Sequence, residues 1–203
     1  MKGKDMNTPN KLTIARMILV PIIVIISMIN IPGMVYQIPV GYLIIDILFI
    51  IASITDKIDG TLARRNNQVT TFGKFLDPIA DKILVISALI ILVERQTLPA
   101  WIPIIIIFRE FAVSGYRMIA VEKGKVIAAN KWGKLKTVTQ MIAIILALID
   151  TNQFGAIFVT RLVGFKFALN LLSTLMMIIC VIATIFSGYE YLKNGKDLIL
   201  QDK

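Results

Sequence analysis

Aspartates recur at helical spacing on both sides of a short polar segment, within "TDKIDGTLARRNNQVTTFGKFLDPIADK", residues 55–82. The four residues are Asp56, Asp59, Asp77 and Asp81. Three or four positions separate the members of each pair, so on a helix both carboxylates lie on one face. Such a cluster repels itself and binds protons unless a cation neutralises it. Carboxylate oxygens suit hard divalent cations, so the pattern predicts a site for Mg²⁺ or Mn²⁺.

Small residues and an arginine accompany these carboxylates. Gly60 and Ala63 share the face of the first pair, and Gly73 lies one turn before the second pair. Glycine lets a bulky ligand approach the helix backbone. Arg64, one turn further along, can bind two phosphate oxygens at once. Acidic residues near a helix end often form only a solvated rim, but four in register beside two glycines are harder to explain that way.

The composition is typical of a membrane protein. Of the 203 residues 57% are hydrophobic, and the mean hydropathy is +0.78. A membrane-spanning helix needs about 20 predominantly apolar residues. Two apolar blocks, 14–29 and 167–186, suffice alone, and four shorter blocks do so only if their helices continue through adjoining polar residues. We therefore predict an all-α polytopic membrane protein with six transmembrane helices around a shared polar cavity.

The expected elements follow from these blocks. The first helix opens at "TPNKLTIAR", four more span about residues 41–64, 71–94, 101–121 and 131–149, and the last ends near residue 192. The prolines and lack of charge in "NIPGMVYQIPVG" predict a short external turn. A short interfacial helix is expected within "DTNQFGAIFVTRLVGFK". Residues 1–8 are predicted to form a mobile N-terminal tail and residues 9–203 a single membrane domain.

The net charge of +9 is unevenly distributed along the chain. With a cytoplasmic N-terminus, six crossings leave only Arg95, Arg161 and Lys166 near the outer side, which is the positive-inside pattern. We therefore expect a multi-pass protein of the cytoplasmic (inner) membrane with both termini in the cytoplasm. Anionic membrane lipids and phosphorylated substrates suit this charge better than nucleic acid. A signal peptide is disfavoured, because the first apolar run is too long and lacks a small-x-small cleavage site.

The spacing Asp-x2-Asp-Gly-x2-Ala-Arg-x8-Gly-x3-Asp-x3-Asp, from Asp56 to Asp81, resembles the signature of the CDP-alcohol phosphatidyltransferase family at every position. The segments "PNKLTIAR", "FLDPIADK", "REFAVSGYR", "GKLKT" and "FSGYEY" extend the likeness over nearly the whole chain. The resemblance implies six transmembrane helices, usually in a homodimer, and a cavity open to the cytoplasm. It also implies that the first three aspartates bind the metals that hold the CDP diphosphate, with Asp81 a further ligand and the base.

The resemblance also indicates a nucleotide side of the site. Asn10 and Thr13 match the family's nucleotide-side segment, together with Arg16. The alternative interpretation of these residues is an N-terminal helix cap and a lipid headgroup contact.

The residue types limit the chemistry. No histidine occurs in the chain, which excludes a phosphatidyltransferase of the phospholipase D type. Neither a Walker loop nor a G-x-S-x-G elbow is found. Metal-assisted direct displacement remains, with the acceptor hydroxyl attacking the phosphorus that carries the lipid. A carboxylate must accept the hydroxyl proton, and Asp81 is favoured over Asp77 for that role.

A second polar group lies in the predicted fourth and fifth helices. An arginine at the centre of a transmembrane helix costs about 2.5–3.5 kcal/mol on the insertion scale, so Arg109 is predicted to line the cavity. Arg117 lies two turns further along nearly the same face, and Lys134 and Lys136 begin the next helix. These four are predicted to bind the phosphate of an anionic acceptor. The alternative is that Glu110 neutralises Arg109 while the lysines meet lipid headgroups.

The likeness is strongest to the bacterial branch of the family that uses sn-glycerol 3-phosphate. It implies transfer of the phosphatidyl group from CDP-diacylglycerol to sn-glycerol 3-phosphate, giving phosphatidylglycerophosphate and CMP. The nearest alternative keeps this chemistry with another acceptor, such as inositol phosphate or serine. A divalent-cation transporter is less favoured, because its binding site would lie near the membrane midplane and these aspartates lie near one face.

Overall fold

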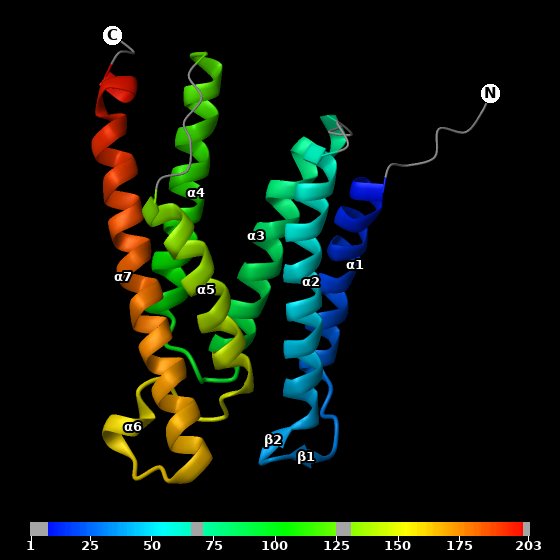
Figure 1. Ribbon diagram of the computed structural model, residues 1–203. Coiled ribbons are helices and arrows are strands. Elements are labelled where there is room, and N and C mark those ends of the chain that lie inside the picture. The colour runs from blue at the N-terminus through cyan, green and yellow to red at the C-terminus, as the bar shows by residue number, and fades with distance from the viewer. Residues whose placement is uncertain (1–7, 66–70, 125–130, 201–203) are drawn as a thin grey trace, which may run out of the picture. The chain divides into compact units, whose positions relative to one another are not determined.

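The computed structural model describes the backbone of residues 8–65, 71–124 and 131–200 (Figure 1). Within these ranges the side chains of residues 8–10, 56–65, 71–75, 192 and 194–200 are not described. The described chain is mostly helical and divides into two compact units, residues 1–95 and 96–203. Most of the predicted N-terminal tail lies outside the described residues.

The first unit is a group of three long helices with a small hairpin. Its elements are α1 (Thr8–Met28), β1 (Met34–Val35), β2 (Ile38–Pro39), α2 (Val40–Arg65) and α3 (Thr71–Glu94). Helix α1 packs against both α2 and α3, which contact each other less extensively. Buried apolar side chains fill this core, including Ile23 of α1, Phe49 of α2 and Leu89 of α3. The predicted second and third helices are confirmed, with boundaries that differ by at most one residue.

The predicted turn before α2 is a two-stranded antiparallel hairpin. Val35 pairs with Ile38, and the two residues between them, Tyr36 and Gln37, have positive φ angles of 48° and 68°. Two positive φ angles in a two-residue loop are the geometry that matches the twist of a hairpin. Near the start of α2, the guanidinium carbon of Arg95 lies 3.6 Å from the centre of the Tyr42 ring. This cation–π contact joins the start of α2 to the end of α3, as antiparallel helices require.

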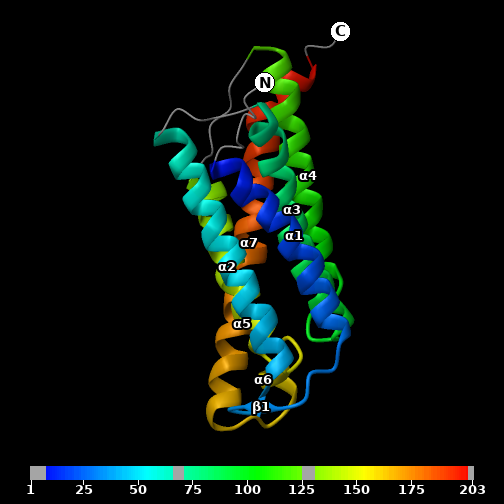
Figure 2. The ribbon, with the colours of Figure 1, turned by 90° about the vertical axis from the view of Figure 1, so that its right-hand side faces the viewer.

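The second unit is built on one long helix. Its elements are α4 (Trp101–Glu122), α5 (Lys131–Ile149), α6 (Ala156–Val159) and α7 (Gly164–Leu200). Helix α7 contacts both α4 and α5, and the two views show α5 and α7 side by side (Figures 1 and 2). A short helix was predicted within residues 150–166, and α6 is found there. Helix α7 continues past the predicted end near residue 192, because the end of an apolar block marks a possible membrane span rather than the end of a helix.

A polar network holds the segment between α5 and α7. Asp150 is buried, and its Oδ1 accepts the backbone N–H of Asn152 at 3.0 Å. The side chain of Asn170, also buried, donates to Asp150 Oδ2 at 2.8 Å and accepts the backbone N–H of Ile157 at 3.0 Å. The hydroxyl of Thr174 accepts the backbone N–H of Gly155 at 3.1 Å. These bonds fasten the connection and α6 to the first turns of α7.

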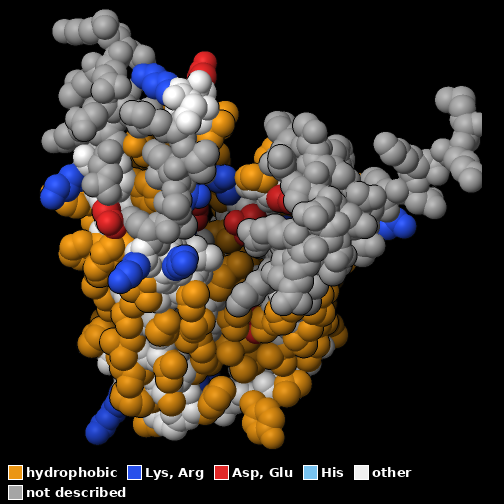
Figure 3. All heavy atoms as spheres, turned by 45° about the horizontal axis from the view of Figure 1, so that its top comes forward, with side chains coloured by type: hydrophobic (Ala, Val, Ile, Leu, Met, Phe, Trp, Pro, Cys, Tyr) orange, Lys and Arg blue, Asp and Glu red, His pale blue; other side chains and the backbone are white. Residues whose placement is uncertain are grey.

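The surface of the described residues is that of a membrane protein. Large hydrophobic side chains are exposed on most helices, and they cover much of the face seen in Figure 3. In the described part of the chain, three helices are long and apolar enough to cross a membrane, with windows at Lys11–Met28, Lys131–Ile149 and Gly164–Tyr191. The apolar part of α2, Val40–Thr55, is shorter. The number of six crossings stays a prediction.

Candidate functional site

The aspartate motif lies on the two helices for which it was predicted. The first half, from Asp56 to Arg64, falls in the last turns of α2, and the second half, from Gly73 to Asp81, falls in the first turns of α3. Several predicted residues lie outside the described side chains: Asn10, Asp56, Asp59, Gly60, Ala63, Arg64 and Gly73. Asp77, Asp81 and Thr13 are described, and they carry the geometry of this part of the site.

Asp77 is bonded to a residue of the predicted nucleotide side. The hydroxyl of Thr13 in α1 donates to Asp77 Oδ1 in α3 across 2.6 Å. Thr13 is only 2% exposed, and Asp77 is half-buried. A short hydrogen bond from a neutral hydroxyl to a carboxylate is charge-assisted, and it fixes the orientation of the carboxylate plane. The structure therefore brings Thr13 and Asp77 together from positions 64 residues apart.

Asp81 lies one turn beyond Asp77 on α3 and is also half-buried. The helix between them contains Pro78, which has no N–H to donate to the carbonyl four residues earlier. Lys82 donates to the carbonyl of Pro78 at 3.3 Å. The i, i+4 spacing of the two aspartates places their side chains on the same side of α3.

The donor set of the motif suits a hard divalent cation, because each predicted ligand is a carboxylate. The bond from Thr13 orients one of these carboxylates, as the polar neighbours of metal ligands commonly do. Among the described side chains no group of three or more His, Cys, Asp or Glu residues is placed to hold a metal ion. Two of the four predicted ligands, Asp56 and Asp59, lie outside that set.

Arg109 lies in a polar group between α4 and α7. Its guanidinium donates to the hydroxyl of Ser187, which is fully buried in α7. Its Nη1 lies 3.7 Å from Glu110 Oε2. A Cβ at Gly188 would come within 3.4 Å of Arg109 Cγ, so glycine leaves room for the arginine stem. The Nε of Arg109 is buried without a hydrogen-bond partner in the described part of the chain.

Lys136 is paired with Glu110 rather than open to solvent. Its side chain is 1% exposed, and its ammonium donates to Glu110 Oε1, whose side chain is 26% exposed. Lys134 is exposed. Residues two positions apart on a helix are separated by a rotation of about 200°, so Lys134 and Lys136 lie on opposite sides of α5. The structure thus brings Lys136 and Arg109 to the same glutamate, and it does not bring Lys134 to them.

Arg117 forms a second arginine contact with α7. Its guanidinium donates to the hydroxyl of Tyr191, and its central carbon lies 5.3 Å from the centre of the same ring. Arg109 lies 5.7 Å from that ring, so Tyr191 contacts both arginines. The ring of Tyr116 meets Tyr191 edge to face at 6.5 Å, within a buried cluster that also contains Val113 and Ala120.

Sequence reasoning did not identify Ser187 and Tyr191 as parts of this group. Both lie in "FSGYEY", a segment that contributed to the family resemblance. Their four-residue separation on a helix, opposite two arginines eight residues apart, was the available signal. Arg16, the remaining nucleotide-side residue, is fully buried in α1.

The aspartate motif on two consecutive, largely apolar helices is typical of a membrane enzyme that acts on phosphate esters. The chain belongs to the CDP-alcohol phosphatidyltransferase family, which it matches over residues 6–186. A protein of Bacillus subtilis strain 168 named CDP-diacylglycerol–glycerol-3-phosphate 3-phosphatidyltransferase is 47% identical over 194 residues, 93% of this chain and 95% of that protein. Proteins of the same name from Haemophilus influenzae and Rickettsia prowazekii are 36% and 34% identical and cover 97% and 95% of this chain, and 97% of each relative is aligned.

Proposed function

We propose that this chain transfers the phosphatidyl group from CDP-diacylglycerol to sn-glycerol 3-phosphate, giving phosphatidylglycerophosphate and CMP. The observation that carries the proposal is the complete aspartate motif, in a chain aligned almost end to end with relatives named for this reaction. The alignment covers 93% of this chain and 95% of the Bacillus subtilis relative, so the likeness extends well beyond the motif.

The proposed metal ligands are Asp56, Asp59, Asp77 and Asp81. The bond from Thr13 to Asp77 supports this assignment, since it orients the Asp77 carboxylate. When bound, Mg²⁺ or Mn²⁺ neutralises charge on the diphosphate and on the departing CMP. Residues proposed to contact the CDP moiety are Asn10, Thr13, Gly60, Ala63, Arg64 and Gly73.

Asp81 is proposed as the base of the reaction. The acceptor hydroxyl oxygen forms a bond to the phosphorus that carries diacylglycerol, while the bond from that phosphorus to the oxygen of CMP breaks. The hydroxyl proton passes to the Asp81 carboxylate, and CMP takes the electron pair of the broken bond. The half-buried position of Asp81 in the first part of α3 supports this role, because a base must be shielded without being cut off from a water-soluble acceptor.

Arg109, Arg117 and Lys136 are proposed to bind the phosphate of the acceptor. The unpartnered Nε atoms of both arginines support this role, because each side chain keeps a donor that no described group satisfies. Glu110 would hold Lys136 and Arg109 in place while reducing their combined charge. Lys134, exposed at the start of α5, stays a prediction as a member of this group.

We further propose an integral protein of the cytoplasmic membrane with six crossings, a polar cavity open to the cytoplasm, both termini in the cytoplasm, and a homodimeric assembly. The three long apolar helices and the exposed hydrophobic side chains support membrane insertion. A reaction that joins a lipid to a water-soluble alcohol must take place at the membrane interface, and the uneven distribution of basic residues supports the cytoplasmic side.

The test is a CMP-release assay on the purified chain with CDP-diacylglycerol and a panel of acceptors: sn-glycerol 3-phosphate, glycerol, serine and inositol phosphate. Of these four acceptors, we expect only sn-glycerol 3-phosphate to cause release of CMP. Replacing Arg117 by Gln is expected to raise the KM for that acceptor at least tenfold and to leave the KM for CDP-diacylglycerol unchanged. Preferential use of serine or another neutral acceptor would overturn the assignment of the acceptor.

A further inference from the structure

An exposed stripe runs along α7 and ends in a lysine. Its hydrophobic members follow helical spacing and are each 43–63% exposed: Leu175, Ile179, Ile182, Phe186 and Tyr189. One turn beyond Tyr189, Lys193 is also exposed. In a helix that spans a membrane, such a stripe faces acyl chains, and its last polar residues lie at headgroup level.

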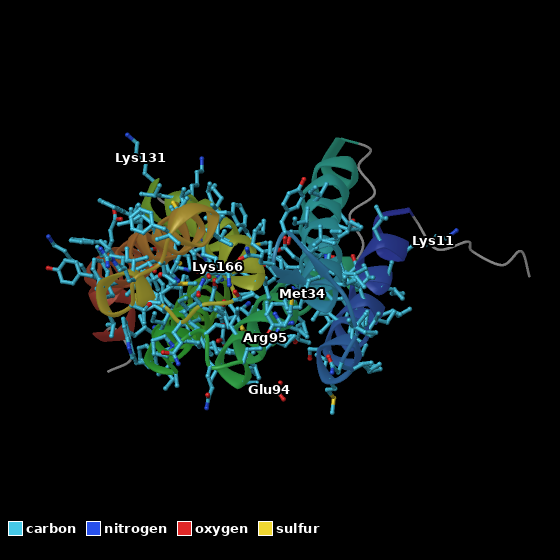
Figure 4. All side chains as sticks on the ribbon, turned by 90° about the horizontal axis from the view of Figure 1, so that it is seen from below. Lys11, Met34, Glu94, Arg95, Lys131 and Lys166 are labelled. Atoms are coloured by element: carbon cyan, nitrogen blue, oxygen red, sulfur yellow. The ribbon has the colours of Figure 1, made fainter. Side chains whose placement is uncertain are left out.

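A matching stripe runs along α5 in the opposite direction. Lys131 is its first residue, and Leu135, Val138 and Ile142 continue it at the same helical spacing with 42–58% exposure. Figure 4 shows the Lys131 side chain extending away from the helices. The apolar windows of the two helices begin at Lys131 and end at Tyr191, so both stripes reach the polar boundary at the same end of this unit.

An aromatic pair joins the two stripes near that boundary. The rings of Trp132 and Phe186 are stacked, with centroids 5.3 Å apart and planes inclined by 20°. Trp132 is 41% exposed and Phe186 51%, so the outer surface of the pair stays open. Tryptophan and tyrosine are enriched at headgroup depth, where an apolar ring meets acyl chains and its polar edge meets the interface.

We propose that this surface, formed by Lys131, Trp132, Phe186, Tyr189 and Lys193 and here called the α5–α7 headgroup site, binds an anionic phospholipid. Charge complementarity selects the occupant: Lys131 precedes Trp132 in α5 and Lys193 follows Tyr189 by one turn in α7, both lysines are exposed, and the phosphate of an anionic lipid carries an uncompensated negative charge. A zwitterionic lipid carries its own cation, so its attraction to the two lysines is weaker. The site lies on the outer surface of the unit, whereas Lys136 on the same helix is buried.

The test uses the fact that the chain has two tryptophans, Trp101 and Trp132. The Trp101→Phe variant of the full chain leaves Trp132 as the only indole. It is reconstituted into bilayers that contain either dibrominated phosphatidylglycerol or dibrominated phosphatidylcholine as the quencher. We expect Trp132 to show at least about a fivefold preference for the anionic quencher, the factor that one lysine near an anionic surface contributes.

Matched variants decide the origin of that preference. Adding Lys131→Gln and Lys193→Gln should reduce the preference to about one, while Lys131→Arg and Lys193→Arg should keep it. In the Trp132→Phe variant the remaining indole is Trp101, which begins α4 and contacts Phe154, just after the end of α5. Trp101 therefore lies at the other end of α5 from Trp132, and the quenching of Trp101 should not respond to these lysines. The measurement needs no turnover, so its outcome is independent of the proposed reaction.

Two results would overturn the proposal. The first is equal quenching of Trp132 by both lipids, or a preference that survives the loss of both lysines. The second is protection of Trp132 from both quenchers, together with a change of oligomeric state in the Lys→Gln variant. That result would assign the surface to a contact between copies of the chain.

Discussion

Thr13 offers the sharpest perturbation of the aspartate site, because its hydroxyl donates directly to Asp77. Replacing Thr13 by Val keeps the side-chain shape and removes the hydroxyl that donates to Asp77 Oδ1 across 2.6 Å. Hydrogen bonds to charged groups contribute about 1.5–3 kcal/mol. Because Thr13 is 2% exposed, water has little access to replace the lost donor. The loss of this free energy corresponds to a change of about 10- to 150-fold in an equilibrium or rate constant, since about 1.4 kcal/mol is a factor of ten.

The effect should appear in the response to metal. Losing a group that orients a metal ligand typically costs about 10- to 100-fold in metal affinity or activity. We expect the Mg²⁺ or Mn²⁺ concentration for half-maximal CMP release to rise by about that factor in Thr13→Val. The Thr13→Ser variant keeps the hydroxyl and should stay within about threefold of the original chain. A folded Thr13→Val protein with an unchanged metal response would refute the role of this bond.

Three further predictions concern the second unit. Glu110→Gln leaves Lys136 buried without its counter-charge and should lower the free energy of unfolding by about 3 kcal/mol. Adding Lys136→Met to Glu110→Gln should recover most of that loss. Thermal unfolding in detergent measures both variants, and additive losses of stability would contradict the pairing. Arg109→Lys should raise the KM for sn-glycerol 3-phosphate at least tenfold, because lysine lacks the planar fork, and an unchanged KM in steady-state kinetics would count against it. Asn170→Leu removes three hydrogen bonds and leaves Asp150 buried. Hydrogen exchange over residues 150–160 should therefore become faster. Unchanged exchange would show that this network does not hold the segment between α5 and α7.

The helices could be predicted because the sequence marks them with apolar blocks separated by proline, glycine and charge. The predicted fifth helix, residues 131–149, is the observed one, and the third agrees at both ends. The end of α7 was misjudged, since polar residues after a membrane span can continue a helix as well as end it. The aspartate motif could be placed on α2 and α3 for the same reason, because spacing along a helix fixes a face.

The partners of the basic residues could not be predicted in the same way. Adjacency in the sequence indicates Glu110 as a partner of Arg109, yet adjacent helical side chains point about 100° apart. The closer partner of Glu110 is Lys136, which comes from another helix. The sequence places Lys134 and Lys136 together at the start of α5, although a rotation of about 200° separates their side chains. Such pairings depend on how helices pack, which the periodicity of a single helix does not determine.

The most direct test of the central claim follows labelled sn-glycerol 3-phosphate into lipid. The purified chain in bilayers with CDP-diacylglycerol and Mg²⁺ or Mn²⁺ should convert it to phosphatidylglycerophosphate and release one CMP for each lipid formed, and Asp81→Asn should abolish both. No labelled lipid from the unmodified chain, or a near-normal rate from Asp81→Asn, would contradict the account.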